Sequence, residues 1–167
     1  MIVPHCEVKI VDPDENGNGE IYAKGDIIML GYYKDEQATK EAFDCEWLKT
    51  GDIGHLDEDG FLYVTGRKKN VIVLSSGKKV YPEELESALA DYIPYIKEVV
   101  VYAKNDLIIA EVFLDIENAP DCASRLDGDI MDFNHTQASY KNIGKTLIRE
   151  TEFKKTTTNK IKRGYAI

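Results

Sequence analysis

The sequence of 167 residues lacks any run of eighteen apolar residues, and its N-terminus has no basic segment followed by a hydrophobic stretch. It therefore predicts neither a membrane span nor a secretion signal, and the cytoplasm is the default compartment. Cysteine is scarce, because the chain has only Cys6, Cys45 and Cys122, which are widely spaced and odd in number. This spacing predicts free thiols rather than a disulfide framework or a metal site.

Histidine is scarce as well. His5, His55 and His135 lie far apart without a nucleophile or base at motif spacing, so none is predicted to be catalytic. The sequence has no aromatic-basic recognition motif, and its net charge of −9 makes nucleic acid a poor candidate partner. A hydrophobic fraction of 43% is normal for a globular chain, and this length allows one ordinary domain or two small ones.

The charge is distributed unevenly along the chain. Residues 1–65 carry 15 acids and 5 bases, whereas residues 66–167 carry 15 acids and 16 bases. From Lys141 onward there are 8 bases and 2 acids. This local excess favours an anionic ligand, although a solvated basic face would explain it equally well.

Residues 1–65 are predicted to be rich in β-structure. Alternating apolar residues predict strands at 7–11 and 19–23 with a turn-rich loop between them, and residues 34–43 have the composition of a helix. The acidic tight turn at 57–60 leads into another extended stretch, which predicts a hairpin.

The remainder mixes helices and strands. Pro82 suits the first position of a helix, and Leu85, Leu89 and Tyr92 give that helix an apolar stripe. The other predicted elements are a hairpin over 71–80, strands at 99–102 and 107–113, a helical region over 121–145 and a last strand at 147–153. Because these elements do not alternate as repeated βαβ units, the predicted fold class is α+β.

Three short motifs contain the residue types that suit binding or catalysis: Trp47-Leu48-Lys49-Thr50-Gly51-Asp52, Gly66-Arg67-Lys68-Lys69 and Thr158-Asn159-Lys160-Ile161-Lys162-Arg163. Gly51 predicts that the Asp52 carboxylate lies at the mouth of a turn, where it could accept hydrogen bonds from sugar hydroxyls or act only as a turn residue. Arg67 suits ribose oxygens, a phosphate or a carboxylate, or a surface salt bridge. Lys160 could bind a phosphate or a carboxylate, or be solvated.

In this order, and with Gly77-Lys78-Lys79-Val80-Tyr81-Pro82-Glu83-Glu84 between the second and third, the motifs resemble the last third of the adenylate-forming enzymes. That superfamily contains acyl-CoA synthetases, luciferases and peptide-synthetase adenylation domains. The resemblance implies that Asp52 binds the ribose hydroxyls of ATP and that Arg67 contacts the nucleotide. It also implies that Lys69 is the hinge about which a C-terminal domain swings.

The resemblance further implies that Gly77 lets the pantetheine arm of CoA pass close to the backbone. Lys160 matches the catalytic lysine that bridges the attacking carboxylate and the α-phosphate while acyl-AMP forms. Two positions depart from the usual pattern. Asn159 stands where the family has glycine, and the interval from Arg67 to Gly77 is one residue longer, as in some long-chain acyl-CoA synthetases. The longer interval favours a fatty acid substrate.

By this resemblance, residues 1–65 are the closing β-rich subdomain of the large adenylation domain, and residues 66–167 are its mobile C-terminal lid. Nothing in the 167 residues resembles the loop that embraces the ATP phosphates or the stretch that helps bind adenine and Mg²⁺. Both ATP and Mg²⁺ would therefore be bound mainly by an N-terminal adenylation domain, and this chain alone is expected to be inactive. Two alternatives are a stand-alone, non-enzymatic module of the same fold that binds a nucleotide, CoA or a carrier protein, and part of a peptide-synthetase adenylation domain.

Overall fold

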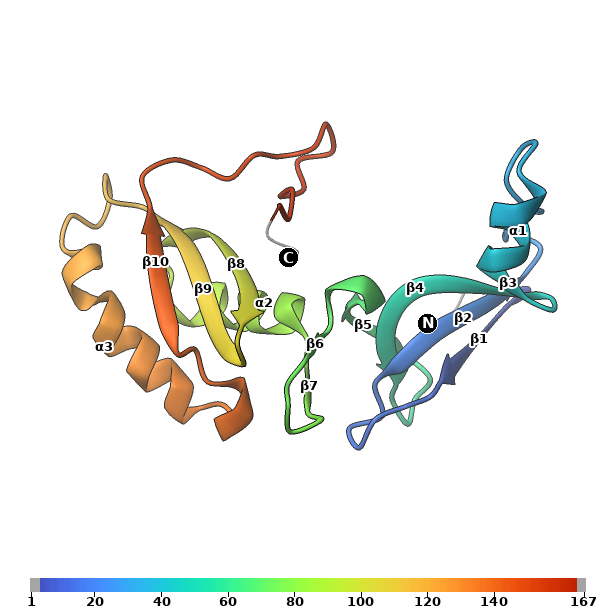
Figure 1. Cartoon of the computed structure of the whole chain (residues 1–167), viewed down its shortest axis with the longest axis horizontal. Coiled ribbons are helices and arrows are strands. Elements are labelled where there is room, and N and C mark those ends of the chain that lie inside the picture. The colour runs from blue at the N-terminus through green and yellow to red at the C-terminus, as the bar shows by residue number, and fades with distance from the viewer. Residues whose placement is uncertain (1–3, 165–167) are drawn as a thin grey trace. The chain divides into compact units, whose positions relative to one another are not determined.

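The structure is a computed structural model that describes residues 4–164. Backbone contacts divide the chain into two compact units, of which unit 1 ends at Asn70 and unit 2 begins at Val71 (Figure 1). Each unit combines strands with helices, which confirms the predicted α+β class. Within the described residues, no helix is both long and apolar enough to cross a bilayer.

Unit 1 is built around a five-stranded sheet in which β1, β2, β4 and β3 follow one another and β5 pairs with β4. The pairs are all antiparallel. The strands at 7–11 and 19–23, the helix and the 57–60 hairpin are confirmed. The elements are β1 (Cys6–Val11), β2 (Gly19–Gly25), α1 (Glu36–Ala42), β3 (Phe43–Asp44), β4 (Trp47–Leu56), β5 (Leu62–Arg67) and the 3₁₀-helix η1 (Lys68–Asn70).

The position of Asp52 corrects the prediction of a turn. Asp52 lies inside β4, which continues from Trp47 to Leu56. Gly51 has a φ of 71° and lies where the β2–β4 register shifts, as at a β-bulge. The Thr50 hydroxyl donates to the Ile21 carbonyl at 2.7 Å and accepts from the Asp52 amide at 3.0 Å. The bulge thus accommodates the positive φ of Gly51 within the strand, and the chain does not reverse direction there.

Unit 2 contains a three-stranded sheet in the order β10, β9, β8. β8 and β9 form the predicted meander, whereas β10 runs parallel to β9 after a crossover through α3. This last strand begins at Lys145 and ends at Arg149, whereas the predicted strand spanned 147–153. The elements are β6 (Ile72–Val73), β7 (Lys79–Val80), α2 (Pro82–Tyr92), β8 (Ile96–Lys104), β9 (Leu107–Leu114), α3 (Cys122–His135), η2 (Ser139–Lys141) and β10 (Lys145–Arg149).

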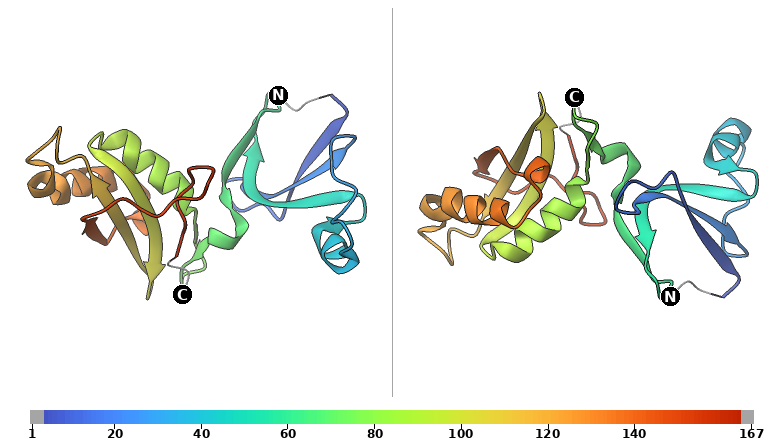
Figure 2. Two further views of the ribbon diagram at one scale, coloured as in Figure 1. Left: turned by 90° about the horizontal axis from the view of Figure 1, so that it is seen from above. Right: turned by 90° about the horizontal axis from the view of Figure 1, so that it is seen from below.

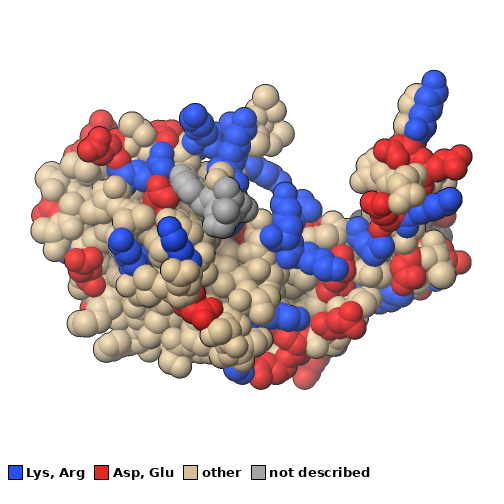
Figure 3. Space-filling view, viewed as in Figure 1, with Lys and Arg blue, Asp and Glu red and all other residues tan. Residues whose placement is uncertain are grey.

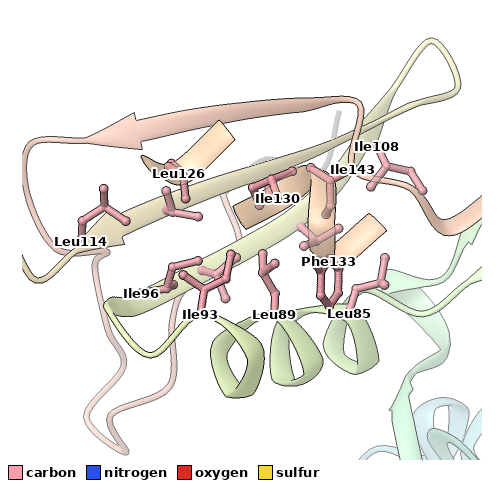
Figure 4. Packing of buried hydrophobic residues seen from close by; sticks show 14 of the residues in the cluster. Leu85, Leu89, Ile93, Ile96, Ile108, Leu114, Leu126, Ile130, Phe133 and Ile143 are labelled. Atoms are coloured by element: carbon pink, nitrogen blue, oxygen red, sulfur yellow. The ribbon is translucent and has the colours of Figure 1, made fainter. Parts of the chain in front are cut away.

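The core of unit 2 lies between its two longer helices and one face of this sheet. Alternate residues of β9, from Ile108 to Leu114, pack against apolar residues of α2 and α3 (Figure 4). Leu85 and Leu89 are buried as predicted, but Tyr92 is 47% exposed, and Ile93 fills the core instead. The rings of Tyr92 and Phe133 pack edge to face with their centroids 5.7 Å apart, so Tyr92 contacts the core from its margin.

The segment after β10 crosses the opposite face of the sheet. Glu98 and Glu111 face that side, because in the strand register they alternate with core residues such as Val99 and Val112. Their carboxylates accept from the Phe153 amide at 2.7 Å and from Arg149 at 2.5 Å, respectively. The path of this segment can be followed in Figures 1 and 2. All three cysteines are free, as predicted, and Cys122 is buried in the core.

Candidate functional site

Asp52 and Arg67, the two predicted nucleotide contacts, lie opposite each other on neighbouring strands of unit 1. Arg67 is the last residue of β5, and its Nε lies 2.9 Å from Oδ1 of Asp52. The two side chains are 50% and 30% exposed, so both retain polar atoms toward solvent. A pair this exposed contributes little to stability, about 0–1 kcal/mol, and leaves both groups able to exchange partners with a ligand.

This juxtaposition depends on a single register shift. Leu56 is opposite Leu62, and a regular hairpin continued from there would put Gly66 opposite Asp52. The register shifts by one residue between Ile53 and Gly54, which brings Arg67 there instead. Because a one-residue slip moves a side chain to the other face of the sheet, the bulge decides that the guanidinium meets the carboxylate.

Lys69, the predicted hinge, is exposed in the 3₁₀-helix η1, and unit 1 ends one residue later at Asn70. The residue before it is fixed to unit 1, because Lys68 Nζ lies 2.7 Å from a carboxylate oxygen of the buried Glu20. Hydrogen bonding to Glu20 is the largest cause of the raised pKa of Lys68. Local sequence patterns do not predict this ion pair, since 48 residues separate its members.

Gly77 lies at the tip of the β6–β7 hairpin, as predicted, with a φ of 80°. Its amide donates to the Leu74 carbonyl at 2.8 Å, and the Leu74 amide donates to the Lys78 carbonyl at 3.0 Å. A Cβ at Gly77 would meet no described atom within 4 Å. The backbone conformation therefore explains the glycine within this chain, and the space beside it is open to a ligand.

Lys160 lies on an exposed hairpin after β10. Lys155 and Ile161 form the bridge of this hairpin, the Thr156 amide donates to the Lys160 carbonyl at 2.8 Å, and the Lys160 amide donates to the Thr156 hydroxyl at 3.1 Å. Asn159 has a φ of 61°, so it adopts the left-handed conformation that glycine adopts readily. Between residues 4 and 164, no carboxylate lies within salt-bridge distance of the Lys160 ammonium.

Arg163 attaches this hairpin to helix α2. Its guanidinium pairs with Glu86, and the same nitrogen lies 3.5 Å from a Glu83 oxygen. The other oxygen of Glu86 accepts from the amide of Val101, on the edge strand β8, at 2.6 Å. Burial raises the pKa of Glu86 to about 7, although the Val101 amide and Arg163 oppose this effect.

Sequence reasoning missed this contact. Glu86, Leu89 and Ile93 follow the i, i+3, i+7 spacing of one helix face, so the sequence does place Glu86 near the buried face of α2. Nothing in the spacing identifies Arg163 as its partner, because the two residues are 77 positions apart. Of the predicted site residues, Asp52 and Arg67 contact each other in unit 1, whereas Gly77 and Lys160 lie on two separate hairpins of unit 2.

A short sheet covered by two helices and followed by a lysine-bearing hairpin defines a C-terminal domain of the type found in adenylate-forming enzymes. The chain belongs to the AMP-binding enzyme C-terminal domain family, whose model matches residues 69–167.

Among known proteins, the long-chain-fatty-acid–CoA ligase ACSBG1 of Rattus norvegicus is 48% identical over 96 residues, which cover 57% of this chain and 13% of that protein. The long-chain-fatty-acid–CoA ligase FadD15 of Mycobacterium tuberculosis is 32% identical over 188 residues, which cover 96% of this chain and 30% of that protein.

Among solved structures, the O-succinylbenzoate coenzyme A synthetase of Bacillus subtilis in complex with AMP matches with a TM-score of 0.80 at 32% identity. The match covers 98% of this chain and 34% of that one. The same enzyme in complex with ATP and a magnesium ion matches with a TM-score of 0.76. The chain therefore spans about a third or less of the length of these relatives.

Proposed function

We propose that this chain is the C-terminal part of an ATP-dependent acyl-CoA ligase. The complete protein would join ATP and a carboxylate to give acyl-AMP and pyrophosphate, and the CoA thiol would then displace AMP to give the thioester. The observation that carries the proposal is the exposed Lys160 hairpin within the region that matches the family model. The CoA ligases among the similar proteins support the same reaction class.

Lys160 is proposed to act in the first step. When the carboxylate attacks the α-phosphate, negative charge gathers on several oxygen atoms, and an ammonium with three donors can contact more than one of them. The geometry supports this role because the turn presents the side chain to solvent and no described carboxylate neutralises it at salt-bridge distance. The second step would need a different arrangement, with Lys160 withdrawn.

Asp52 and Arg67 are proposed to bind the nucleotide. The Asp52 carboxylate can accept from both hydroxyls of a ribose, while Arg67 has five N–H donors and contacts Asp52 through only one of them in the described ion pair. Rotation about Lys69 would exchange the two arrangements, since this residue lies next to the boundary between the units. Gly77 is proposed to lie beside the pantetheine arm of CoA in the second step.

Magnesium is proposed to bind mainly to the N-terminal adenylation domain. In residues 4–164 no group of three or more His, Cys, Asp or Glu residues is arranged to hold a metal ion. A long-chain fatty acid is the proposed substrate. The two long-chain-fatty-acid–CoA ligases among the relatives and the longer interval from Arg67 to Gly77 support this choice.

The two half-reactions of the full-length protein test this proposal separately. Lys160→Ala should abolish most acyl-AMP formation, measured by pyrophosphate exchange, but should spare thioester formation from supplied acyl-AMP. Equal loss in both steps would refute the assignment of Lys160 to the first step. The purified 167-residue chain should show neither reaction. Turnover by that chain alone would contradict its proposed role as one part of a larger ligase.

A further inference from the structure

The Lys160 hairpin is attached to the body of unit 2 at both ends. At its start, Glu98 on β8 accepts from the Phe153 amide at 2.7 Å and pairs with the Lys155 ammonium. At its end, Glu86 on α2 pairs with Arg163. The Glu98 and Glu86 side chains are only 9% and 14% exposed, so both attachment points belong to the packed body of the unit.

The attachment at Arg163 is the more specific of the two. Glu86 uses one oxygen for the Val101 amide and the other for Arg163, so a single carboxylate joins α2, the edge strand β8 and the C-terminal segment. Charge-assisted hydrogen bonds at a partly buried carboxylate are stronger and more directional than exposed ion pairs. Glu83 lies 3.5 Å from the same Arg163 nitrogen and adds a second negative charge beside it.

The segment that forms the hairpin is also rich in basic residues. Figure 3 shows Lys and Arg side chains gathered along the segment that follows β10. Lys154, Lys160 and Lys162 are exposed on this segment, whereas Lys155 and Arg163 turn inward to the partly buried Glu98 and Glu86. The cations thus divide into two attached side chains and three that face solvent.

We propose that Arg163 and Glu86 are positioning residues that hold the Lys160 hairpin in its productive conformation. The inference rests on the proposed function, because it presupposes the role of Lys160 in acyl-AMP formation. It assigns no substrate contact to Arg163 or Glu86. Only two residues, Ile161 and Lys162, separate Lys160 from Arg163. Loss of the attachment would therefore leave the hairpin held only through Lys155 at its start, and misplacement of the ammonium by about 1 Å can lower a rate by about a hundredfold.

Hydrogen exchange in the 167-residue chain tests the attachment without any assay of activity. Arg163→Gln should accelerate exchange at the Thr156, Asn159 and Lys160 amides by about tenfold, because one charge-assisted bond is lost. Glu84→Gln is the matched control. Glu84 lies on the same helix and pairs with Lys141 at 2.8 Å, away from the hairpin, so its loss should leave these amides unchanged.

Three results would overturn the inference. They are unchanged hairpin exchange in Arg163→Gln, equal acceleration in Glu84→Gln, and uniform acceleration across the β8 and β9 amides, which would make Arg163 a determinant of overall stability. Arg163→Lys should restore part of the protection, because it keeps the charge but loses the planar fork.

The full-length protein supplies the second readout. Arg163→Gln should lower kcat for acyl-AMP formation by about ten- to a hundredfold, with KM for ATP unchanged, since the ground-state contacts at Asp52 and Arg67 remain. A change in KM alone would overturn the positioning role. If Lys160→Ala leaves acyl-AMP formation intact, the proposed function fails. Altered hairpin exchange in Arg163→Gln would still establish the attachment, so the two failures are distinguishable.

Discussion

Glu86 should make the stability of unit 2 depend on pH in an unusual direction. Its carboxyl group has an ordinary pKa of 4.5, which burial raises to about 7 in the folded protein. Between these values the folded state binds the proton more tightly than the unfolded state does. The stabilisation is therefore complete below pH 4.5 and is lost as the pH rises through about 7.

The size of the effect follows from the same two values. The gap between 4.5 and about 7, at roughly 1.4 kcal/mol per pH unit, corresponds to about 3 kcal/mol in the free energy of unfolding. Glu86→Gln removes the titrating group, so the difference between the two proteins isolates it from other carboxyl groups. Arg163 lowers the pKa of Glu86, and Arg163→Gln should therefore extend the loss of stability to higher pH.

The chain contains an internal reference for this experiment. Trp47, the only tryptophan, lies in unit 1, so its fluorescence follows unit 1 during denaturant unfolding. Far-UV circular dichroism reports mainly on α2 and α3 of unit 2. Relative to Glu86→Gln, the wild-type dichroism transition should move to lower denaturant between about pH 5 and about pH 8. Parallel pH profiles for the two proteins would refute the reasoning.

The remaining predictions concern packing and backbone conformation. Leu89→Ala should lower the stability of unit 2 by about 2–5 kcal/mol, because the fully buried side chain leaves a cavity, and the dichroism transition measures this loss. The Trp47 transition should not move, and a matching shift there would contradict independent packing of the units. Asn159→Gly should preserve the hairpin, whereas Asn159→Val should destabilise its turn by about 1–2 kcal/mol at a φ of 61°. Exchange at the Lys160 amide distinguishes the two variants, and equal protection in both would exclude a requirement for the left-handed conformation.

Local signals predicted most elements of the fold. Pro82 at the first helical turn and the spacing of Leu85 and Leu89 predicted α2, and both leucines are buried. Alternation and turn residues likewise predicted the β4–β5 and β8–β9 pairs. The parallel pairing of β10 with β9 was not predicted, because it joins strands separated by a helix and depends on a tertiary crossover rather than on local pattern.

The site shows the same division between local and long-range information. The motifs identified Asp52 and Arg67 separately, but only the register shift in β4–β5 determines that they face each other. Periodicity places Glu86 at the buried face of its helix, yet the choice of Arg163 depends on how the C-terminal segment crosses the sheet. A partly buried ion pair between distant residues has no periodic signature in the sequence, and its members become apparent only in the folded chain.

The most direct test of the central claim compares two neighbouring lysines of one hairpin. In the full-length protein, the single-turnover rate of acyl-AMP formation should fall by about 10²- to 10³-fold in Lys160→Ala, the cost typical of losing one group that stabilises developing charge. Lys162→Ala removes another exposed cation two residues away and should change that rate less than about twofold. Equal rates for the two variants would contradict a specific role for Lys160 and would leave only a general contribution of positive charge.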